Sequence, residues 1–156
     1  MNDGGIIRGH DLFQSLGLDD AHGLSDFSFT RRFEANEVIF RFGDKAEQIF
    51  MLLSGSVELR LPNDPQDLSL VISRIEKGEL FGLSPMLNST LYTATAFCRE
   101  PTEVLSIDAT PLREMLLKNH MVGFNFMNQV ALIYFNRYIA VLNSVQKAIG
   151  EIALTH

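Results

Sequence analysis

The sequence predicts a mainly β domain, an antiparallel roll or sandwich, with helices at both ends. Short β-rich runs divided by turn residues extend from Phe27 to Asp108. Apolar residues at helical spacing precede and follow that region. The total of 156 residues suits a single folding unit. We therefore expect an N-terminal helical segment at residues 1–24, a β-roll at 25–108 and C-terminal helices at 109–156.

The elements follow in chain order. A short amphipathic helix is expected within His10–Gly23, because Leu12, Phe13, Leu16 and Leu18 lie at helical spacing around Gly17. Glycine, proline and Asn/Asp turns then separate the predicted strands. These strands are Phe27–Phe33, Val38–Arg41, Gln48–Leu53, Ser56–Leu61, Leu68–Ile75, Tyr92–Phe97 and Val104–Ile107.

After Asp108 the spacing becomes helical, with Pro111 near the start of a first helix and a second helix from about Val122 to Ala153. On the second helix two rows of residues recur every seven positions, as in a coiled-coil seam. One row is Asn128, Phe135, Leu142 and Ile149, and the other is Phe124, Ala131, Tyr138, Val145 and Ile152.

This long helix has two interpretations. The whole apolar stripe could be intramolecular core, as amphipathic stripes usually are. However, about thirty residues extend roughly 45 Å at 1.5 Å per residue, which is longer than a roll of this size covers. We therefore expect one side to pack on the roll and the other to form a homodimer, with Asn128 fixing the register of the two helices.

Composition and charge exclude several functional classes. The chain carries 13 Lys and Arg against 19 Asp and Glu, a net charge of −6 with scattered cations, so we expect no nucleic-acid binding. No apolar run approaches the length of a membrane span and no secretory signal is recognised, which favours a cytoplasmic protein without membrane association. The single Cys98 excludes an intramolecular disulfide and is expected in the core.

Catalytic motifs are also missing from the sequence. There is no Gly-x-Ser-x-Gly, no His-Glu-x-x-His and no Gly-x-x-x-x-Gly-Lys. The acidic pair Asp19-Asp20 is interpreted as part of a turn, and so is Asp64. We therefore expect a binding or assembly module and not an enzyme.

Two stretches carry a family resemblance. Glu37–Leu59 has glycines at Gly43 and Gly55 between apolar runs, and Gly78–Ala96 opens with Gly-Glu-Leu-Phe-Gly. Together they resemble the cyclic nucleotide-binding domain of the catabolite-activator and fumarate-nitrate-reductase regulator superfamily, with 78–96 similar to its phosphate-binding cassette. The resemblance implies a β-roll of the double-stranded jelly-roll type that senses a ligand in signal transduction.

The resemblance also implies where a ligand would bind. The cassette's short helix would offer backbone N–H groups to a cyclic phosphate. The residues expected around the ligand are Phe81, Gly82, Leu83, Ser84, Tyr92, Thr93 and Ala94. Leu83 stands where the family has a glutamate for the ribose, and Tyr92 stands where it has an arginine for the phosphate. Losing both charged contacts would weaken binding by about 10²- to 10⁴-fold.

No other cation is expected to replace the missing arginine. Arg99 lies too far along the strand from Tyr92, and Arg60, Arg74 and Lys77 are interpreted as solvated surface charge. Relatives that have abandoned cyclic nucleotides respond to other signals, haem-bound gas among them. His10, His22, His120 and His156 are interpreted as surface or helix-end residues, and His120 is the first to test as a haem ligand.

Three functional hypotheses remain. The chain is a homodimeric sensor of a small effector other than cyclic AMP or cyclic GMP, a weak cyclic-nucleotide binder, or a ligand-free module for dimerisation or docking. No cofactor is required by the sequence, so a cyclic nucleotide and another small effector are both candidates. A downstream protein partner is compatible with all three. Because no recognition helix follows the long helix before His156, this chain is not expected to bind DNA.

Overall fold

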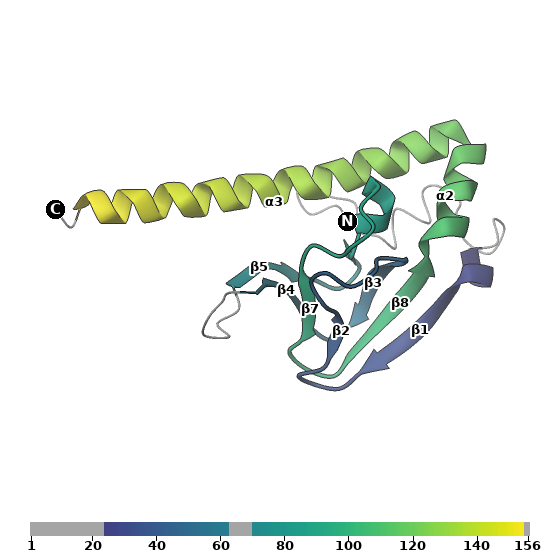
Figure 1. The fold of residues 1–156 in the computed structure, drawn as a ribbon, viewed down its shortest axis with the longest axis horizontal. Helices are drawn as coiled ribbons and strands as arrows, with labels where there is room; N and C mark the ends of the chain where they lie inside the picture. The colour runs from purple at the N-terminus through teal and green to yellow at the C-terminus, as the bar shows by residue number, and fades with distance from the viewer. Residues whose placement is uncertain (1–23, 63–69, 155–156) are drawn as a thin grey trace.

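The computed structural model describes residues 24–62 and 70–154, which form two four-stranded antiparallel sheets and two C-terminal helices (Figure 1). The first sheet has the order β1 (Ser28–Phe33), β8 (Thr102–Asp108), β3 (Gln48–Ser54), β6 (Leu80–Phe81). The second has the order β2 (Val38–Phe40), β7 (Thr95–Cys98), β4 (Val57–Leu61), β5 (Leu70–Ile75). The predicted fold class is therefore confirmed. The expected helix within His10–Gly23 lies outside the described residues.

Helical elements complete the chain. Two short 3-10 helices are η2 (Leu24–Phe27) and η3 (Ser84–Leu87), and the α-helices are α2 (Ala109–Lys118) and α3 (His120–Leu154). Both α-helices were predicted, and α3 begins two residues earlier than expected. Among the described residues, no helix combines the length and the apolar character needed to cross a bilayer.

The predicted strand Tyr92–Phe97 is wrong at its start. β7 begins only at Thr95, because the backbone of Tyr92 pairs instead with the Gly43-Asp44 turn. The Tyr92 N–H donates to the Asp44 carbonyl at 2.9 Å, and the Gly43 N–H donates to the Tyr92 carbonyl at 2.9 Å. The two-residue strand β6 was not predicted, because so short a run has no periodicity to detect.

Strand β3 is central because both of its faces are buried. Ile49 and Met51 point into a core shared with α2 and α3, whereas Phe50 and Leu52 point into the core between the two sheets. This alternation explains why β3 reads as an unbroken apolar run and not as alternating apolar and polar residues.

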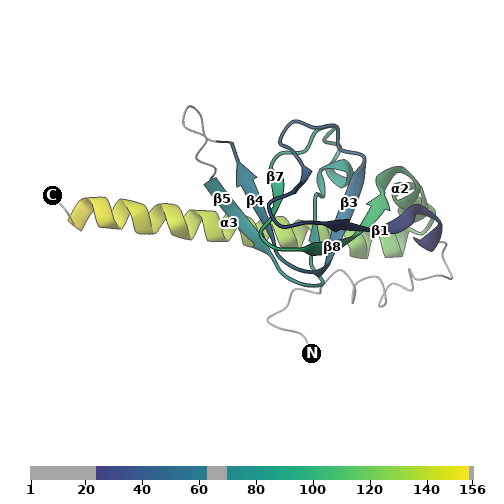
Figure 2. The same cartoon turned by 90° about the horizontal axis from the view of Figure 1, so that it is seen from below.

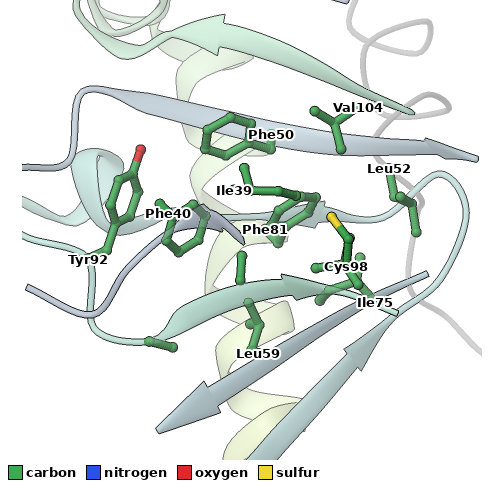
Figure 3. Packing of buried hydrophobic residues seen from close by; sticks show 13 residues of the cluster. Ile39, Phe40, Phe50, Leu52, Leu59, Ile75, Phe81, Tyr92, Cys98 and Val104 are labelled. Atoms are coloured by element: carbon green, nitrogen blue, oxygen red, sulfur yellow. The ribbon is translucent and has the colours of Figure 1, made fainter. Parts of the chain in front are cut away.

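Stacked aromatic rings fill the core between the sheets (Figure 3). The ring of Phe40 stacks on Tyr92 with centroids 3.9 Å apart and on Phe50 at 5.5 Å, and Phe50 stacks on Phe81 at 5.4 Å. Cys98 is fully buried at the far end of this core, as expected, and burial raises the pKa of its thiol. The thiol therefore remains a neutral core group.

Gly82 is pressed against these rings. Its φ is +66°, and a Cβ at this position would lie 2.9 Å from Phe50 Cδ2 and 3.0 Å from Phe40 Cε2. Both the backbone conformation and the space thus require glycine. The stack consequently fixes the path of the chain between β6 and η3.

α3 is seated on the roll near its N-terminal end. A Cβ on Gly123 would lie 2.6 Å from the Leu116 carbonyl oxygen, so glycine allows α2 and α3 to approach closely. Phe126 and Val130, both fully buried, then pack α3 into the core over the first sheet. Figures 1 and 2 show the C-terminal part of α3 running past β5 and clear of the roll.

Gly82→Ala should destabilise the fold more than Gly43→Ala. Both glycines have positive φ, but nothing lies within 4 Å of a Cβ at Gly43, so that variant measures the backbone effect alone. Crowding against Phe40 and Phe50 should add about 1–3 kcal/mol to the loss at Gly82. Urea unfolding followed by circular dichroism checks this, and equal losses for the two variants would show that the rings yield freely.

Candidate functional site

A cavity of about 300 Å³ lies between the second sheet, the segment before η3, and α3. Six of the seven residues expected around a ligand line it, together with three roll residues and four from α3. The full lining is Phe40, Leu59, Ile72, Gly82, Leu83, Ser84, Tyr92, Thr93, Ala94, Tyr134, Arg137, Tyr138 and Val141. Phe81 was expected there but is fully buried, because its ring stacks on Phe50 in the core behind the cavity. Such a volume is at the lower end for small-molecule sites.

Leu83 contributes hydrocarbon at the position of the family's glutamate. Its side chain is 1 % exposed and belongs to the core that α2 and α3 share with the roll. Its carbonyl accepts a hydrogen bond from the Met86 N–H at 2.9 Å, which begins the four-residue turn η3. Ser84 is also buried, so the polar contribution of this segment to the cavity is small.

Tyr92 contributes its ring to the cavity lining, and its hydroxyl is bonded elsewhere. Its hydroxyl is directed to β3, where it donates to the Gln48 carbonyl at 2.7 Å and accepts from the Gln48 N–H at 3.3 Å. Burial raises the pKa of the Tyr92 hydroxyl, which therefore stays neutral. Beside it, Thr93 is exposed at the edge of the cavity and Ala94 is buried.

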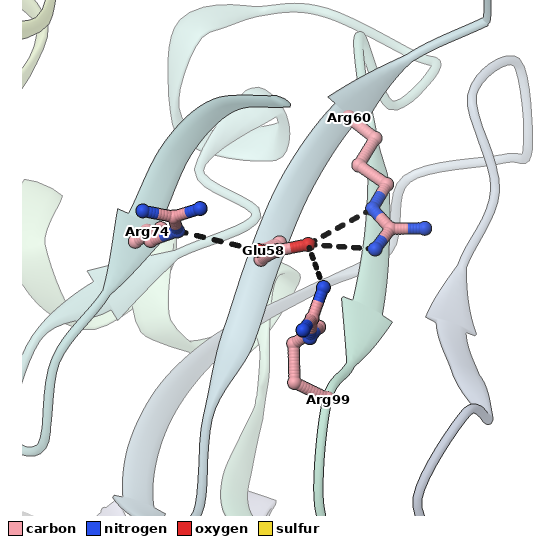
Figure 4. Close-up of polar contacts among 4 residues, drawn as sticks. All are labelled: Glu58, Arg60, Arg74 and Arg99. Atoms are coloured by element: carbon pink, nitrogen blue, oxygen red, sulfur yellow. Dashed lines mark hydrogen bonds and ion pairs between the residues drawn. The ribbon is translucent and has the colours of Figure 1, made fainter. Parts of the chain in front are cut away.

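The arginines considered from the sequence lie on the opposite face of the second sheet. Arg60, Arg74 and Arg99 converge on Glu58, whose neighbours Val57 and Leu59 point into the core (Figure 4). The nitrogen–oxygen distances to the carboxylate are 2.7 Å for Arg60, 3.2 Å for Arg74 and 3.8 Å for Arg99. The expectation of solvated surface charge is thus wrong for Arg60, which is also packed over the Phe97 ring at 3.8 Å. Lys77 is exposed and does not line the cavity.

Glu58 is a buried carboxylate kept ionised by these partners. Burial alone would raise its pKa, but the hydrogen bonds from Arg60 and Arg74, with the charges of Arg60 and Arg99, outweigh burial and hold the pKa below its ordinary value. The cluster consequently stabilises the outer face of the sheet and supplies no cation to the cavity.

Sequence reasoning missed Arg137, which is the one charged side chain among the residues lining the cavity. It lies on the roll-facing stripe of α3, in line with Phe126, Val130 and Ile133. The available signal was a cation on an otherwise apolar, core-facing stripe, opposite the more regular heptad rows. Arg137 therefore enters the site from the helix and not from the cassette.

The predicted seam on α3 faces away from the roll except at its edge, where Tyr138 also lines the cavity. Nine residues at about 100° each place Phe135 about two and a half turns beyond Phe126, on the opposite side of the helix. The large apolar members of both rows are 44–73 % exposed. They are Phe124, Phe135, Tyr138, Leu142, Val145, Ile149 and Ile152; Asn128 and Ala131, in the same rows, are exposed as well. An apolar stripe of this length is what a partner surface presents.

His120, the first candidate for a haem ligand, begins α3 at a distance from this cavity. It borders a separate groove lined by Leu117, Phe124 and Met127, among others. Within residues 24–62 and 70–154, no three His, Cys, Asp or Glu side chains are grouped to hold a metal ion. The other three histidines lie outside the described residues.

Known proteins resemble this chain in sequence and fold. The family model described as "Cyclic nucleotide-binding domain" matches residues 30–119. The "Anaerobic regulatory protein" of Bacillus subtilis (strain 168) is 32 % identical over 106 residues, which are 67 % of this chain and 44 % of that protein. The chain thus spans less than half the length of this curated relative.

Solved structures share the fold. A protein from Geobacter metallireducens GS-15, provisionally assigned as cyclic nucleotide-binding, is 29 % identical with a TM-score of 0.69, over 81 % of this chain and 91 % of that one. The sensor domain of the transcriptional regulator DNR from Pseudomonas aeruginosa has 18 % identity and a TM-score of 0.69, over 81 % and 85 % of the two chains. The catabolite activator protein of Thermus thermophilus has 24 % identity and a TM-score of 0.65, over 85 % and 62 %.

Glu58→Gln should lower stability in a pH-dependent way. Because the pKa of Glu58 is lower in the fold than its ordinary value of 4.5, its stabilisation is complete above pH 4.5 and is lost as the pH falls through the folded value. We expect a loss of about 1–3 kcal/mol at pH 7.

The difference from wild type should shrink below pH 4.5, which urea unfolding at pH 7 and pH 4 measures. Glu103→Gln is the control, because Glu103 pairs with the exposed Arg32 and should contribute less than about 1 kcal/mol. A difference for Glu58→Gln that stays constant with pH would contradict the assignment.

Proposed function

This chain belongs to the cyclic nucleotide-binding domain family, and on that premise we propose that it is the ligand-sensing part of a homodimeric regulator. The observation that carries the proposal is the joint lining of one cavity by the roll and by α3. Tyr138 lines that cavity and also belongs to the heptad seam. A molecule in the cavity therefore touches the surface that would meet a second copy of the chain.

Coupling between ligand and dimer would follow from differential contact. A ligand touching both the second sheet and α3 binds more tightly to the arrangement in which these two surfaces are correctly spaced. Binding then shifts the population toward that arrangement. The free energy of coupling equals the difference between the ligand's binding free energies for the two arrangements. The state of the α3 pair would be passed to a downstream domain or protein partner.

We further propose that the ligand is neither cyclic AMP nor cyclic GMP. Leu83 and Tyr92 provide an apolar side chain and an uncharged aromatic ring at the positions where the family places its acid and its arginine. Arg60, Arg74 and Arg99, on the other face of the sheet, cannot compensate. The open cavity favours a sensor over a ligand-free docking module. A domain with a purely structural role would be more stable if its own side chains filled this space.

Calorimetric titration should detect no binding of cyclic AMP or cyclic GMP at micromolar concentration. The two missing charged contacts weaken binding by about 10²- to 10⁴-fold relative to a family member that has both. Such a member, titrated in parallel, serves as the positive control. A micromolar dissociation constant would instead favour cyclic-nucleotide binding through Gly82, Ser84, Thr93 and backbone groups.

Leu142→Lys should dissociate the dimer, whereas the neighbouring Asn143→Lys should not. Leu142 is in the seam and Asn143 is exposed on the polar side of α3, so the two variants add the same charge to different faces. Removing a buried leucine from each copy costs about 1.5–3 kcal/mol per side chain, which raises the dissociation constant by at least about tenfold. Analytical ultracentrifugation distinguishes the species, and a monomeric wild type would refute the dimer.

A further inference from the structure

Arg137 lies in a largely apolar setting and forms no ion pair with a carboxylate of the described residues. Burial lowers the pKa of its guanidinium, and the Tyr134 hydroxyl and Glu79 offset this effect only in part. Glu79 acts on the guanidinium through its charge but forms no ion pair with it, and one of its carboxylate oxygens accepts a hydrogen bond from the Glu76 N–H at 2.7 Å. Among the described residues no carboxylate forms an ion pair with Arg137, whose guanidinium carbon lies 5.5 Å from the Tyr134 ring centroid.

A guanidinium in these surroundings remains positively charged, because burial lowers its pKa from a value far above neutral pH. Removing a cation from water without a counter-charge is unfavourable. Within the part of the chain that the structure describes, Arg60, Arg74 and Arg99 share the carboxylate of Glu58, whereas Arg137 forms no ion pair. A ligand in the cavity could therefore supply the negative charge with which Arg137 would form an ion pair.

The other residues that line the cavity indicate the chemical character of the uncharged part of such a ligand. Four aromatic side chains line the cavity, Phe40 and Tyr92 from the roll and Tyr134 and Tyr138 from α3. Leu59, Ile72, Leu83, Ala94 and Val141 add aliphatic surface. Such aromatic and aliphatic walls favour a flat apolar body.

We propose that the cavity binds a small monoanion with a flat apolar body, and that Arg137 pairs with its anionic group. This inference rests on the proposed sensor function and names the ligand class of the same site. A carboxylate or a phosphodiester provides the single charge that one guanidinium neutralises, with the bidentate geometry that arginine favours. The anion is then held by the helix, where the family holds it by the cassette.

Two fluorescent probes that differ by one charge test the assignment. The probe 8-anilino-1-naphthalenesulfonate is a flat monoanion, and N-phenyl-1-naphthylamine is the same ring system without the sulfonate. Arg137→Gln should weaken the anionic probe by about tenfold to a hundredfold and leave the neutral probe within about twofold. Fluorescence titration of the full-length wild type and variants gives both dissociation constants.

Lys147→Gln is the matched control, because it removes one positive charge from an exposed position on the same helix. It should change neither probe, and unfolding midpoints should show that both variants are folded. Equal binding of the anionic probe to Arg137→Gln and wild type would overturn the role of Arg137 and leave the sensor proposal intact. Failure of the wild type to bind either probe would mean a closed cavity and would overturn both proposals.

Competition against the bound anionic probe distinguishes the two sources of charge. Displacement by indole-3-acetate in wild type but not in Arg137→Gln supports a carboxylate ligand. Displacement by cyclic AMP with the same dependence on Arg137 supports the anion site but overturns the exclusion of cyclic nucleotides.

Discussion

Phe126 and Val130 pack against the core over the first sheet. The positions of the cavity and of the seam on α3 both depend on this contact. These fully buried side chains hold one stripe of α3 on the roll, while Gly123 allows the close turn from α2 that aims the helix. From that fixed start, helical periodicity determines the rest. Arg137 follows on the stripe that faces the roll, and Leu142 and Val145 follow on the stripe that faces away. One seating contact thus creates both a cavity and a free apolar seam.

The floor of the cavity follows from the aromatic stack in the same way. Tyr92 stacks on Phe40 at 3.9 Å and directs its hydroxyl to Gln48, so the residue belongs to the packing of the roll as much as to the site. Its backbone pairs with the Gly43-Asp44 turn, which removes it from strand β7. An aromatic ring at this position stabilises the core and forgoes the cation that the family places there. One side chain would therefore set both the packing of the core and the proposed ligand preference.

The sequence was sufficient to predict the fold, because β-rich composition identifies the strands and the positions of the glycines mark the turns between them. The buried run of β3 and the heptad rows of α3 could be read directly, and both helices were placed within two residues at their N-termini. The sequence was insufficient where long-range contacts decide. Nothing local to Tyr92 showed that the strand would begin at Thr95, and nothing local to Arg60 showed that three arginines would surround Glu58. The place of Arg137 in the cavity could not be predicted, because it depends on which face of α3 packs against the roll.

Glu58 and Arg137 are two partly or fully buried charged groups whose charge is compensated in different ways. At Glu58 the counter-charges are supplied by the chain itself, so folding alone satisfies the carboxylate and its pKa falls. At Arg137 the chain supplies rings, aliphatic carbon and the charge of Glu79 without an ion pair, so folding alone compensates the guanidinium only in part. A site left unfavourable in the free protein gains more from a complementary ligand than one already neutralised, because binding both forms the ion pair and relieves the desolvation. Since Arg137 and Tyr138 are adjacent on α3, the same event would act at the edge of the seam, and ligand affinity would be linked to helix pairing.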